Sequence, residues 1–222
     1  SDVYKRQMLK KVWLVAFIVL FIDQLSKFYI KTNFELHESV EVFKGFQLAF
    51  VENPGMAYGI EFGGLFGKHL LTIFRIGLIG FIIWFVMKWS RKKASNFFLL
   101  PVALILAGAI GNVIDCLFYG IIFDKGTVYN DQLMSWVGYN GLAKANFDGY
   151  SSFMLGCVVD MLYFPLFEFD WPTWVPIVGG THYKFFQPVF NIADSAIFIG
   201  IACLLIFRKK AFVTKTGEHI HF

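Results

Sequence analysis

The residues best suited to chemistry in this sequence are aspartates that stand beside or inside apolar segments. Asp160 follows "VV" in an apolar stretch, and Asp194 stands in "FNIADSAIFIG" at the start of a long apolar run. A carboxylate withdrawn from water is costly, so each position needs a reason to exist. Two carboxylates that lie close together share one proton, and the ionised one can take a proton from a water molecule that attacks an amide. The pair therefore predicts aspartyl protease chemistry; an ordinary exposed loop residue is the alternative for Asp160.

Other polar side chains stand in short groups within apolar segments. Asp23 and Lys27, in "DQLSK", are four residues apart on one helix face, so they either form an ion pair that orders the bundle or take part in function. Asn112 and Asp115, in "GAIGNVID", are three residues apart, and interhelical hydrogen bonding is the alternative to a functional role. Asn191 has the same spacing from the aspartate of "FNIAD". Small residues in the second group favour close helix packing.

Several other kinds of site are excluded by the sequence. It contains no HExxH, no GxSxG and no Cys–His arrangement, and its cysteines lack metal-ligand spacing, so we expect neither a metal nor a cofactor. A disulfide between Cys116 and Cys157 is the less favoured alternative to free thiols. The net charge is +4, but no block of basic residues is interleaved with exposed aromatics, which argues against a nucleic-acid partner.

The composition predicts that these residues are positioned by membrane-spanning helices. Hydrophobic residues make up 57% of the 222 residues and charged residues only 16%, whereas soluble domains have about 45–50% and about 25%. The apolar residues gather in runs, and about 20 helical residues cover a hydrocarbon core of about 30 Å. The sequence therefore predicts an all-α bundle of four transmembrane helices. The predicted spans are 12–30, 69–87, 97–118 and 189–207.

The basic residues predict the orientation of the bundle. Lysine and arginine stand before the first span, in "KWSRKK" between the second and third, and in "RKK" after the fourth, whereas both long loops carry more acidic than basic residues. Because cations near the ends of spans mark the cytoplasmic side, both termini are expected in the cytoplasm. We interpret 1–7 as a leader foreign to the protein, 8–210 as one integral membrane domain and 211–222 as a cytoplasmic tail.

The two far-side loops contain structural elements of their own. The stretch 40–53 alternates as strands do, and 53–60 breaks that pattern with turn residues. The second loop begins with a polar part, about 124–150. It continues with a part rich in Trp, Tyr and Phe that is expected to rest as a lid in the bilayer interface.

Five short blocks, in this order, resemble those of the bacterial lipoprotein signal peptidases (signal peptidase II). They are "DQLSK", "VENPGMAYGI", "GAIGNVID", "VVD" and "FNIADSAIFIG", and the resemblance covers 8–210 apart from loop insertions. It implies an aspartyl endopeptidase, without metal or cofactor, in the bacterial cytoplasmic (inner) membrane. The enzyme would cut diacylglyceryl-modified prolipoproteins just before the lipidated cysteine. The implied fold has four transmembrane helices, a small extracytoplasmic β-cradle and an interfacial helix or loop lid.

The resemblance also implies roles for individual residues. Asp160 and Asp194 would be the catalytic pair on the extracytoplasmic side. Substrate-binding and supporting positions would be Asn53, Gly55, Asn112, Asp115, Asn191, Ala193, Asp23 and Lys27. The implied partners are lipid-modified prolipoproteins and membrane lipids, and the protein is expected to act as a monomer.

Three departures from the family pattern stand out. Cys116 replaces the arginine that usually follows the third block, the second block reads "NPGMAYG" where "NxGAAF" is usual, and 119–157 and 161–187 are enlarged. Two functions of other classes stay open on the residues alone. One is a small proton-coupled carrier or channel component, which would place its charges nearer the midplane. The other is a membrane scaffold whose polar groups only join helices.

Overall fold

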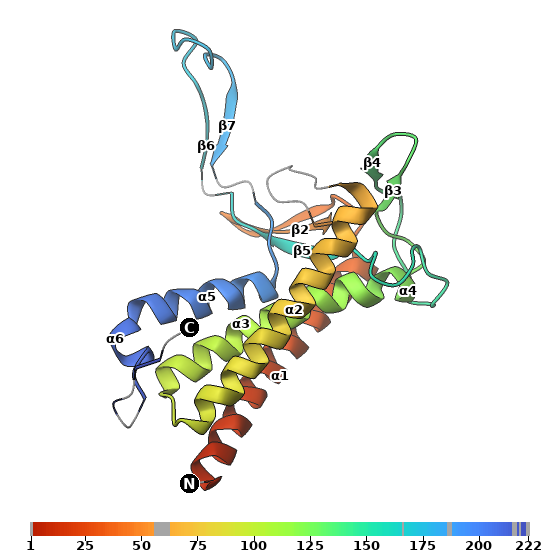
Figure 1. Cartoon of the computed structure of the whole chain (residues 1–222). Helices are drawn as coiled ribbons and strands as arrows, with labels where there is room; N and C mark the ends of the chain where they lie inside the picture. Colours follow the sequence, from red (N-terminus) through yellow and green to blue (C-terminus); the bar gives the residue numbers. More distant parts are fainter. Residues whose placement is uncertain are drawn as a thin grey trace.

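Long helices form the body of the molecule in this computed structural model (Figure 1). The structure describes residues 2–55, 63–165, 167–185, 188–214, 217 and 219–220. Its helices are α1 (Asp2–Asn33), α2 (Gly64–Arg91), α3 (Asn96–Ile114), the π-helical turn η1 (Asp115–Tyr119), α4 (Gly120–Ile122), α5 (Ile192–Ile206) and α6 (Arg208–Ala211). Three stretches within them are long and apolar enough to cross a membrane, namely Leu9–Asn33, Gly64–Arg91 and Asn96–Ile122. The chain is therefore an integral membrane protein.

The fourth apolar segment is shorter than the sequence predicted. We expected a span over 189–207, but α5 has 15 residues and begins only at Ile192. Its start is delayed because Phe190 forms backbone bridges to Leu162 and Asn191 caps the helix. At 1.5 Å per residue, α5 covers only about 22 Å.

Small residues bring α3 and α5 into close contact, as the sequence predicted for "GAIGNVID". A Cβ on Gly108 would lie 2.2 Å from the Ala193 carbonyl oxygen, and one on Gly111 would lie 2.6 Å from Asp23 Oδ2. A Cβ added to Gly200 of α5 would lie 2.6 Å from the Pro101 carbonyl oxygen of α3. The backbones of two helices can therefore approach where a larger residue would separate them.

A three-stranded antiparallel sheet stands at one end of the bundle (Figure 1). Its strands are β1 (Ser39–Phe43), β2 (Phe46–Asn53) and β5 (Val158–Tyr163), in the order β1-β2-β5. The strands expected over 40–53 are thus confirmed as β1 and β2. A second hairpin, β3 (Val128–Asn130) with β4 (Ser135–Val137), lies beside the first turns of α2. Residues 56–60 of the "VENPGMAYGI" block lie outside the described residues.

The aromatic part of the second loop forms a hairpin. Strands β6 (Phe167–Asp170) and β7 (His182–Phe185) pair and project away from the bundle (Figure 1). Between Phe123 and Asn191, the described residues form strands, turns and irregular backbone and contain no helix. Of the expected interfacial helix or loop lid, the described part therefore contains no helix, and the alternating sequence around Phe169 pairs as a β-ribbon.

Strand β5 is joined both to the sheet core and to the start of α5. Val159 and Met161 are buried in a cluster with Ile30, Phe50 and Phe123. Successive side chains on a strand point to opposite faces, so Asp160, between Val159 and Met161, points away from this cluster. At the end of β5, Leu162 and Phe190 exchange two backbone hydrogen bonds of 2.7 and 3.0 Å. This contact holds the first turn of α5 against β5.

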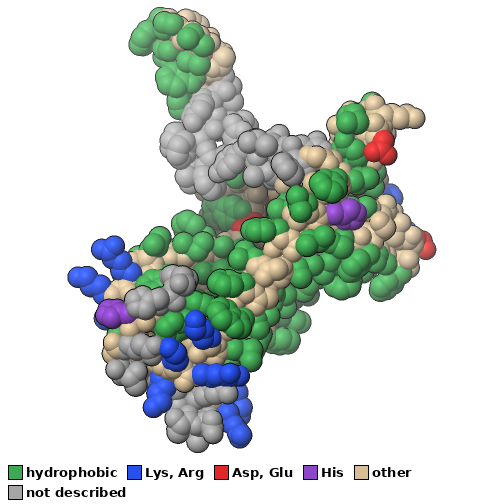
Figure 2. All heavy atoms as spheres, viewed as in Figure 1, with side chains coloured by type: hydrophobic (Ala, Val, Ile, Leu, Met, Phe, Trp, Pro, Cys, Tyr) green, Lys and Arg blue, Asp and Glu red, His purple; other side chains and the backbone are tan. Residues whose placement is uncertain are grey.

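Charge is distributed unevenly along the molecule. Figure 2 shows basic side chains gathered at the end of the bundle that carries α6, with a broad hydrophobic surface between that end and the sheet. Exposed basic residues of this cluster include Lys88, Arg91, Lys92, Lys93, Arg208, Lys209 and Lys210. Exposed phenylalanines and leucines on α1, α2 and α5 cover the middle, as expected for a lipid-facing belt.

Candidate functional site

Asp194 is fixed at the first turn of α5 by a reciprocal cap. Its backbone N–H donates to Asn191 Oδ1 (2.9 Å), and its Oδ2 accepts from the Asn191 backbone N–H (3.3 Å). This capping box satisfies two of the free N–H groups at a helix start. Oδ1 of Asp194 also accepts from Asn112 Nδ2 at 2.8 Å, which ties the carboxylate to α3. The side chain is half-buried.

Asp160, on β5, also contacts Asn191 and is buried, with 4% of its surface exposed. Its Oδ1 accepts a hydrogen bond of 2.7 Å from Asn191 Nδ2. One asparagine therefore contacts both carboxylates, with its amide nitrogen on one and its backbone N–H on the other. Burial, and next the negative charge of Asp194, raise the pKa of Asp160 to about 8.

A second group of charges lies beneath this pair. Lys27 Nζ contacts Asp23 Oδ2 at 3.0 Å and Asp115 Oδ2 at 2.8 Å, and all three side chains are almost completely buried. The lysine also donates to Asn112 Oδ1 at 2.8 Å. The predicted pairing of Asp23 with Lys27 is confirmed, and the pair extends to the third span. Lys27 therefore forms an ion pair with each of the two intrahelical aspartates.

These intrahelical aspartates also position backbone around the candidate site. Asp23 Oδ1 accepts from the Ala193 N–H at 2.8 Å, and Asp115 Oδ2 accepts from the Val159 N–H at 3.3 Å. Asp23 thus holds the residue directly before Asp194, and Asp115 holds the residue directly before Asp160. Asp23 and Asp115 differ from Asp160 and Asp194 in having an ion-pair partner within the described residues, Lys27.

The structure brings most of the predicted site residues together around Asn191. Asn53 and Gly55 are the exceptions, because they lie at and just after the end of β2. Asn53 pairs with Val158 in the strand register, whereas Asp160 pairs with Val51. Asn53 Oδ1 accepts from the Gly55 N–H at 2.8 Å, which forms a tight turn at the end of β2. The turn leads into 56–62, outside the described residues.

The sequence reasoning missed three polar residues near the site. Gln24 Nε2 donates to Asp115 Oδ1 (2.9 Å) and to Asp23 Oδ2 (3.1 Å), linking the two carboxylates. Lys31 forms a buried ion pair with Glu52, surrounded by aromatic rings. Gln24 stands within "DQLSK" and could have been noticed there. The pairing of Lys31 with a strand residue had no local signal.

The cysteines form no disulfide. Cys116, Cys157 and Cys203 are all free thiols, and the first two are buried. Cys157 Sγ donates to the Thr127 carbonyl, and burial raises the pKa of this thiol to about 12. A disulfide between Cys116 and Cys157 is therefore absent. No group of three or more potential metal ligands occurs in the described part of the chain.

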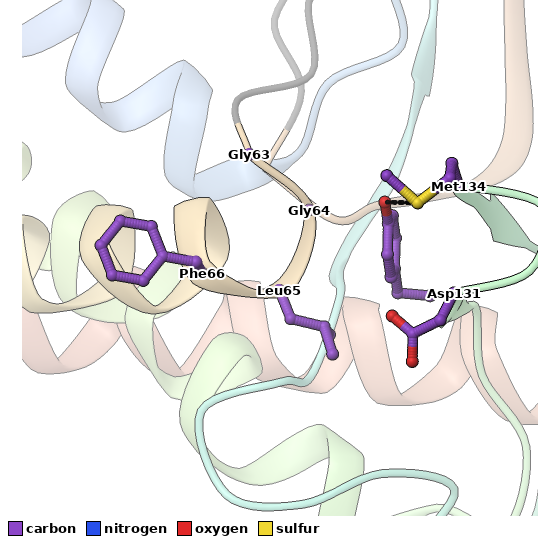
Figure 3. Close-up of a pocket in the computed structure, with 7 residues that line it drawn as sticks. Gly63, Gly64, Leu65, Phe66, Asp131 and Met134 are labelled. Atoms are coloured by element: carbon purple, nitrogen blue, oxygen red, sulfur yellow. Dashed lines mark hydrogen bonds between the residues drawn. The ribbon is translucent and has the colours of Figure 1, made fainter.

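A separate hollow of about 540 Å³ lies between the start of α2 and the β3–β4 hairpin (Figure 3). Its lining residues are Gly63, Gly64, Leu65, Phe66, Tyr129, Asp131 and Met134. Asp131 is the only carboxylate among them, and none belongs to the polar group around Asn191. The hollow is therefore distinct from the candidate site.

Comparison with known proteins identifies the family to which this arrangement belongs. The sequence model of Signal peptidase (SPase) II matches residues 15–209. The chain belongs to the signal peptidase II family. A relative named lipoprotein signal peptidase from Porphyromonas gingivalis is 43% identical over 198 residues, covering 89% of this chain and 82% of the relative. One with the same name from Amoebophilus asiaticus is 36% identical over 211 residues, covering 92% and 80%.

Solved structures agree with this assignment at the level of fold. A bacterial membrane enzyme determined by the in meso method at 1.9 Å superimposes with a TM-score of 0.55 and 24% identity, over 90% of this chain and 94% of that one. Membership in the signal peptidase II family makes the chain a membrane protease that processes lipoproteins. The alternatives of a carrier and a non-catalytic scaffold are thereby set aside.

Proposed function

We propose that this signal peptidase II cuts diacylglyceryl-modified prolipoproteins immediately before the lipidated cysteine, with Asp160 and Asp194 as its catalytic pair. One observation carries the assignment of the pair. Asp23 and Asp115 both form an ion pair with Lys27, whereas Asp160 and Asp194 have no ion-pair partner within the described residues and are joined through Asn191. Two neighbouring aspartates without an ion-pair partner can share a proton.

The two carboxylates have different surroundings. Asp160 is buried and has a pKa of about 8, so it carries its proton at neutral pH. Asp194 is half-buried and accepts hydrogen bonds from Asn112 Nδ2 and from the Asn191 backbone N–H. We therefore assign Asp160 as the proton donor and Asp194 as the proton acceptor.

The reaction then follows without a covalent intermediate. Asp194 removes a proton from water as the oxygen attacks the carbonyl carbon of the scissile amide, and Asp160 donates its proton to the carbonyl oxygen. In the second step the tetrahedral intermediate collapses as its hydroxyl proton returns to Asp160. The proton held by Asp194 passes to the amide nitrogen, and the C–N bond breaks. The products are the released signal peptide and a lipoprotein with a free amino terminus on its cysteine.

The proposal includes a membrane orientation. The basic end lies in the cytoplasm with both termini, and α5 serves as the fourth span despite its length, since a bilayer thins around short spans. The sheet β1-β2-β5 then forms a cradle on the extracytoplasmic side, where the lipid-anchored substrate presents its peptide bond. The β6–β7 hairpin acts as the lid, with Trp174 and Ile177 highly exposed. The enzyme acts as a monomer among membrane lipids.

Cleavage of a synthetic lipobox peptide tests this function. Purified full-length protein in detergent is given a peptide with a diacylglyceryl cysteine and the same peptide with an unmodified cysteine. We expect one cut before the cysteine of the lipidated peptide, seen by mass spectrometry and unchanged by EDTA. Cleavage at another bond, equal cleavage of both peptides, or loss of activity with EDTA would refute the proposal.

A further inference from the structure

Arg75 is a cation within the membrane-spanning part of α2, and the reaction proposed above does not use it. It stands in a helix whose neighbours in sequence are apolar, "LLTIFRIGLIGF", and its side chain is half-buried. Its guanidinium Nη1 donates to Cys116 Sγ at 3.5 Å. Charged residues inside spans are costly and default to functional roles that face the protein interior.

The contact with Cys116 leaves Arg75 poorly compensated. A guanidinium has five N–H donors, and a thiol is a weak acceptor that takes only one of them. Within the described part of the chain, Arg75 forms no ion pair. Two lysines of the first span differ in this respect, because Lys27 contacts two carboxylates and Lys31 pairs with Glu52. Arg75 therefore has donors available for an oxygen-bearing ligand.

The contact with Cys116 places Arg75 next to residues that hold β5. Cys116 directly follows Asp115, which holds the Val159 N–H next to Asp160, and the Cys116 carbonyl accepts from the Gly156 N–H at 3.0 Å. Helical side chains lean toward the start of their own helix, which for α2 is the end near the sheet. The guanidinium thus lies against Cys116, whose backbone carbonyl holds the segment that enters β5. Cys116 is also where the family pattern has arginine, so here α2 brings a cation to that position.

We propose that Arg75 is a substrate-binding residue, and that its guanidinium N–H groups bind a carbonyl oxygen of the lipidated substrate. This inference rests on the function proposed above. A diacylglyceryl cysteine carries ester carbonyls into the membrane, and the signal peptide carries amide carbonyls along the same path. Either carbonyl oxygen can accept hydrogen bonds from the guanidinium, and the bilayer core offers few other acceptors.

Kinetics of Arg75 variants test the proposal on the full-length protein. We compare Arg75→Gln and Arg75→Lys with Arg91→Gln, an exposed arginine at the other end of α2. The loss of a charged hydrogen bond predicts that Arg75→Gln raises KM about tenfold or more, with kcat within about threefold of wild type. The KM of Arg75→Lys should be intermediate, and the KM of Arg91→Gln should equal that of wild type. Arg75→Gln combined with Cys116→Arg should regain part of the lost affinity.

Two substrates separate the sources of the oxygen. One lipobox peptide carries ester-linked chains, and the other carries ether-linked chains without carbonyls. If the esters are bound, wild type has a raised KM for the ether substrate and Arg75→Gln adds nothing further. If peptide carbonyls are bound, Arg75→Gln raises KM equally for both substrates, and either result supports the inference.

An unchanged KM for both substrates in Arg75→Gln would overturn the proposal, and so would a fall in kcat alone accompanied by a lower melting temperature. Asp194→Asn distinguishes this failure from failure of the proposed function. If Arg75→Gln is normal while Asp194→Asn is inactive, only the role of Arg75 fails. If Asp194→Asn remains active, the proposed function itself fails.

Discussion

At the scale of single residues, Asn191 determines how the two proposed catalytic carboxylates are presented. Its amide nitrogen contacts Asp160, and its side-chain oxygen caps the helix at Asp194. The same amide nitrogen also lies 3.1 Å from Asn112 Oδ1. The asparagine is fully buried, so its side chain has little freedom to move. The site is therefore held in place before a substrate binds, which is what efficient proton transfer requires.

The protonation of Asp160 predicts how activity depends on pH. Burial and the charge of Asp194 raise its pKa to about 8, so it holds its proton below that pH and loses it as the pH rises. Once both carboxylates are ionised, no acid remains to polarise the carbonyl. We expect kcat/KM to fall about tenfold per pH unit above about pH 8. A profile that is flat or rises up to pH 10, measured with the lipobox peptide, would contradict this role.

At the scale of elements, the α3–α5 contact and the β5–α5 bridge bring distant segments together at the site. Asn112 on α3 reaches Asp194 on α5, and this contact depends on the close approach of the two helices at Gly108. The bridge between Leu162 and Phe190 brings β5 to the same place. A displacement of α5 would therefore separate both carboxylates from their partners.

Gly108→Ala tests the dependence of the site on helix packing. The added Cβ would lie 2.2 Å from the Ala193 carbonyl oxygen, so α5 must shift. Overpacking of this kind costs about 1–3 kcal/mol, and we expect a lower melting temperature together with lower kcat. Gly77→Ala on α2 is the matched control because nothing lies within 4 Å of its added Cβ. Equal behaviour of the two variants would show that the close contact is unimportant.

Some of these elements were predictable from the sequence. The spacing of Asp23 and Lys27 predicted their ion pair, because residues four apart share one helix face. The alternation in 40–53 predicted two strands. Contacts across long sequence separations were not predictable, since the link from Asn191 to Asp160 depends on how β5 meets α5. The predicted span 189–207 includes the cap at Asn191, whereas α5 begins only after that residue.

At the scale of the whole molecule, the protein has a basic end, an apolar belt and an end that carries the sheet (Figures 1 and 2). The carboxylate pair lies where the belt meets the sheet, since Asp194 begins α5 and Asp160 belongs to β5. We propose that a substrate anchored in lipid reaches that boundary sideways from the bilayer. The β6–β7 hairpin, whose strands were not predicted from the sequence, projects on the side of the sheet.

Removal of the hairpin's aromatic tip tests its proposed role as a lid. The segment 171–174, "WPTW", includes Trp174 with 80% of its surface exposed. If it rests in the interface and limits water at the site, replacing it with Gly and Ser should lower kcat/KM about tenfold and leave the melting temperature unchanged. The same replacement at 131–134, in the β3–β4 hairpin, serves as the control. Unchanged turnover in the "WPTW" variant would remove the lid from the account.

The central claim is that Asp160 and Asp194 form the catalytic pair, and single-turnover cleavage of the diacylglyceryl lipobox peptide tests it most directly. Asp160→Asn and Asp194→Asn should each lose cleavage by about four orders of magnitude or more while remaining folded. Asp131→Asn, an exposed aspartate outside the polar group, should cleave as wild type does. Cleavage at the wild-type rate by a folded Asp160→Asn or Asp194→Asn variant would contradict the claim.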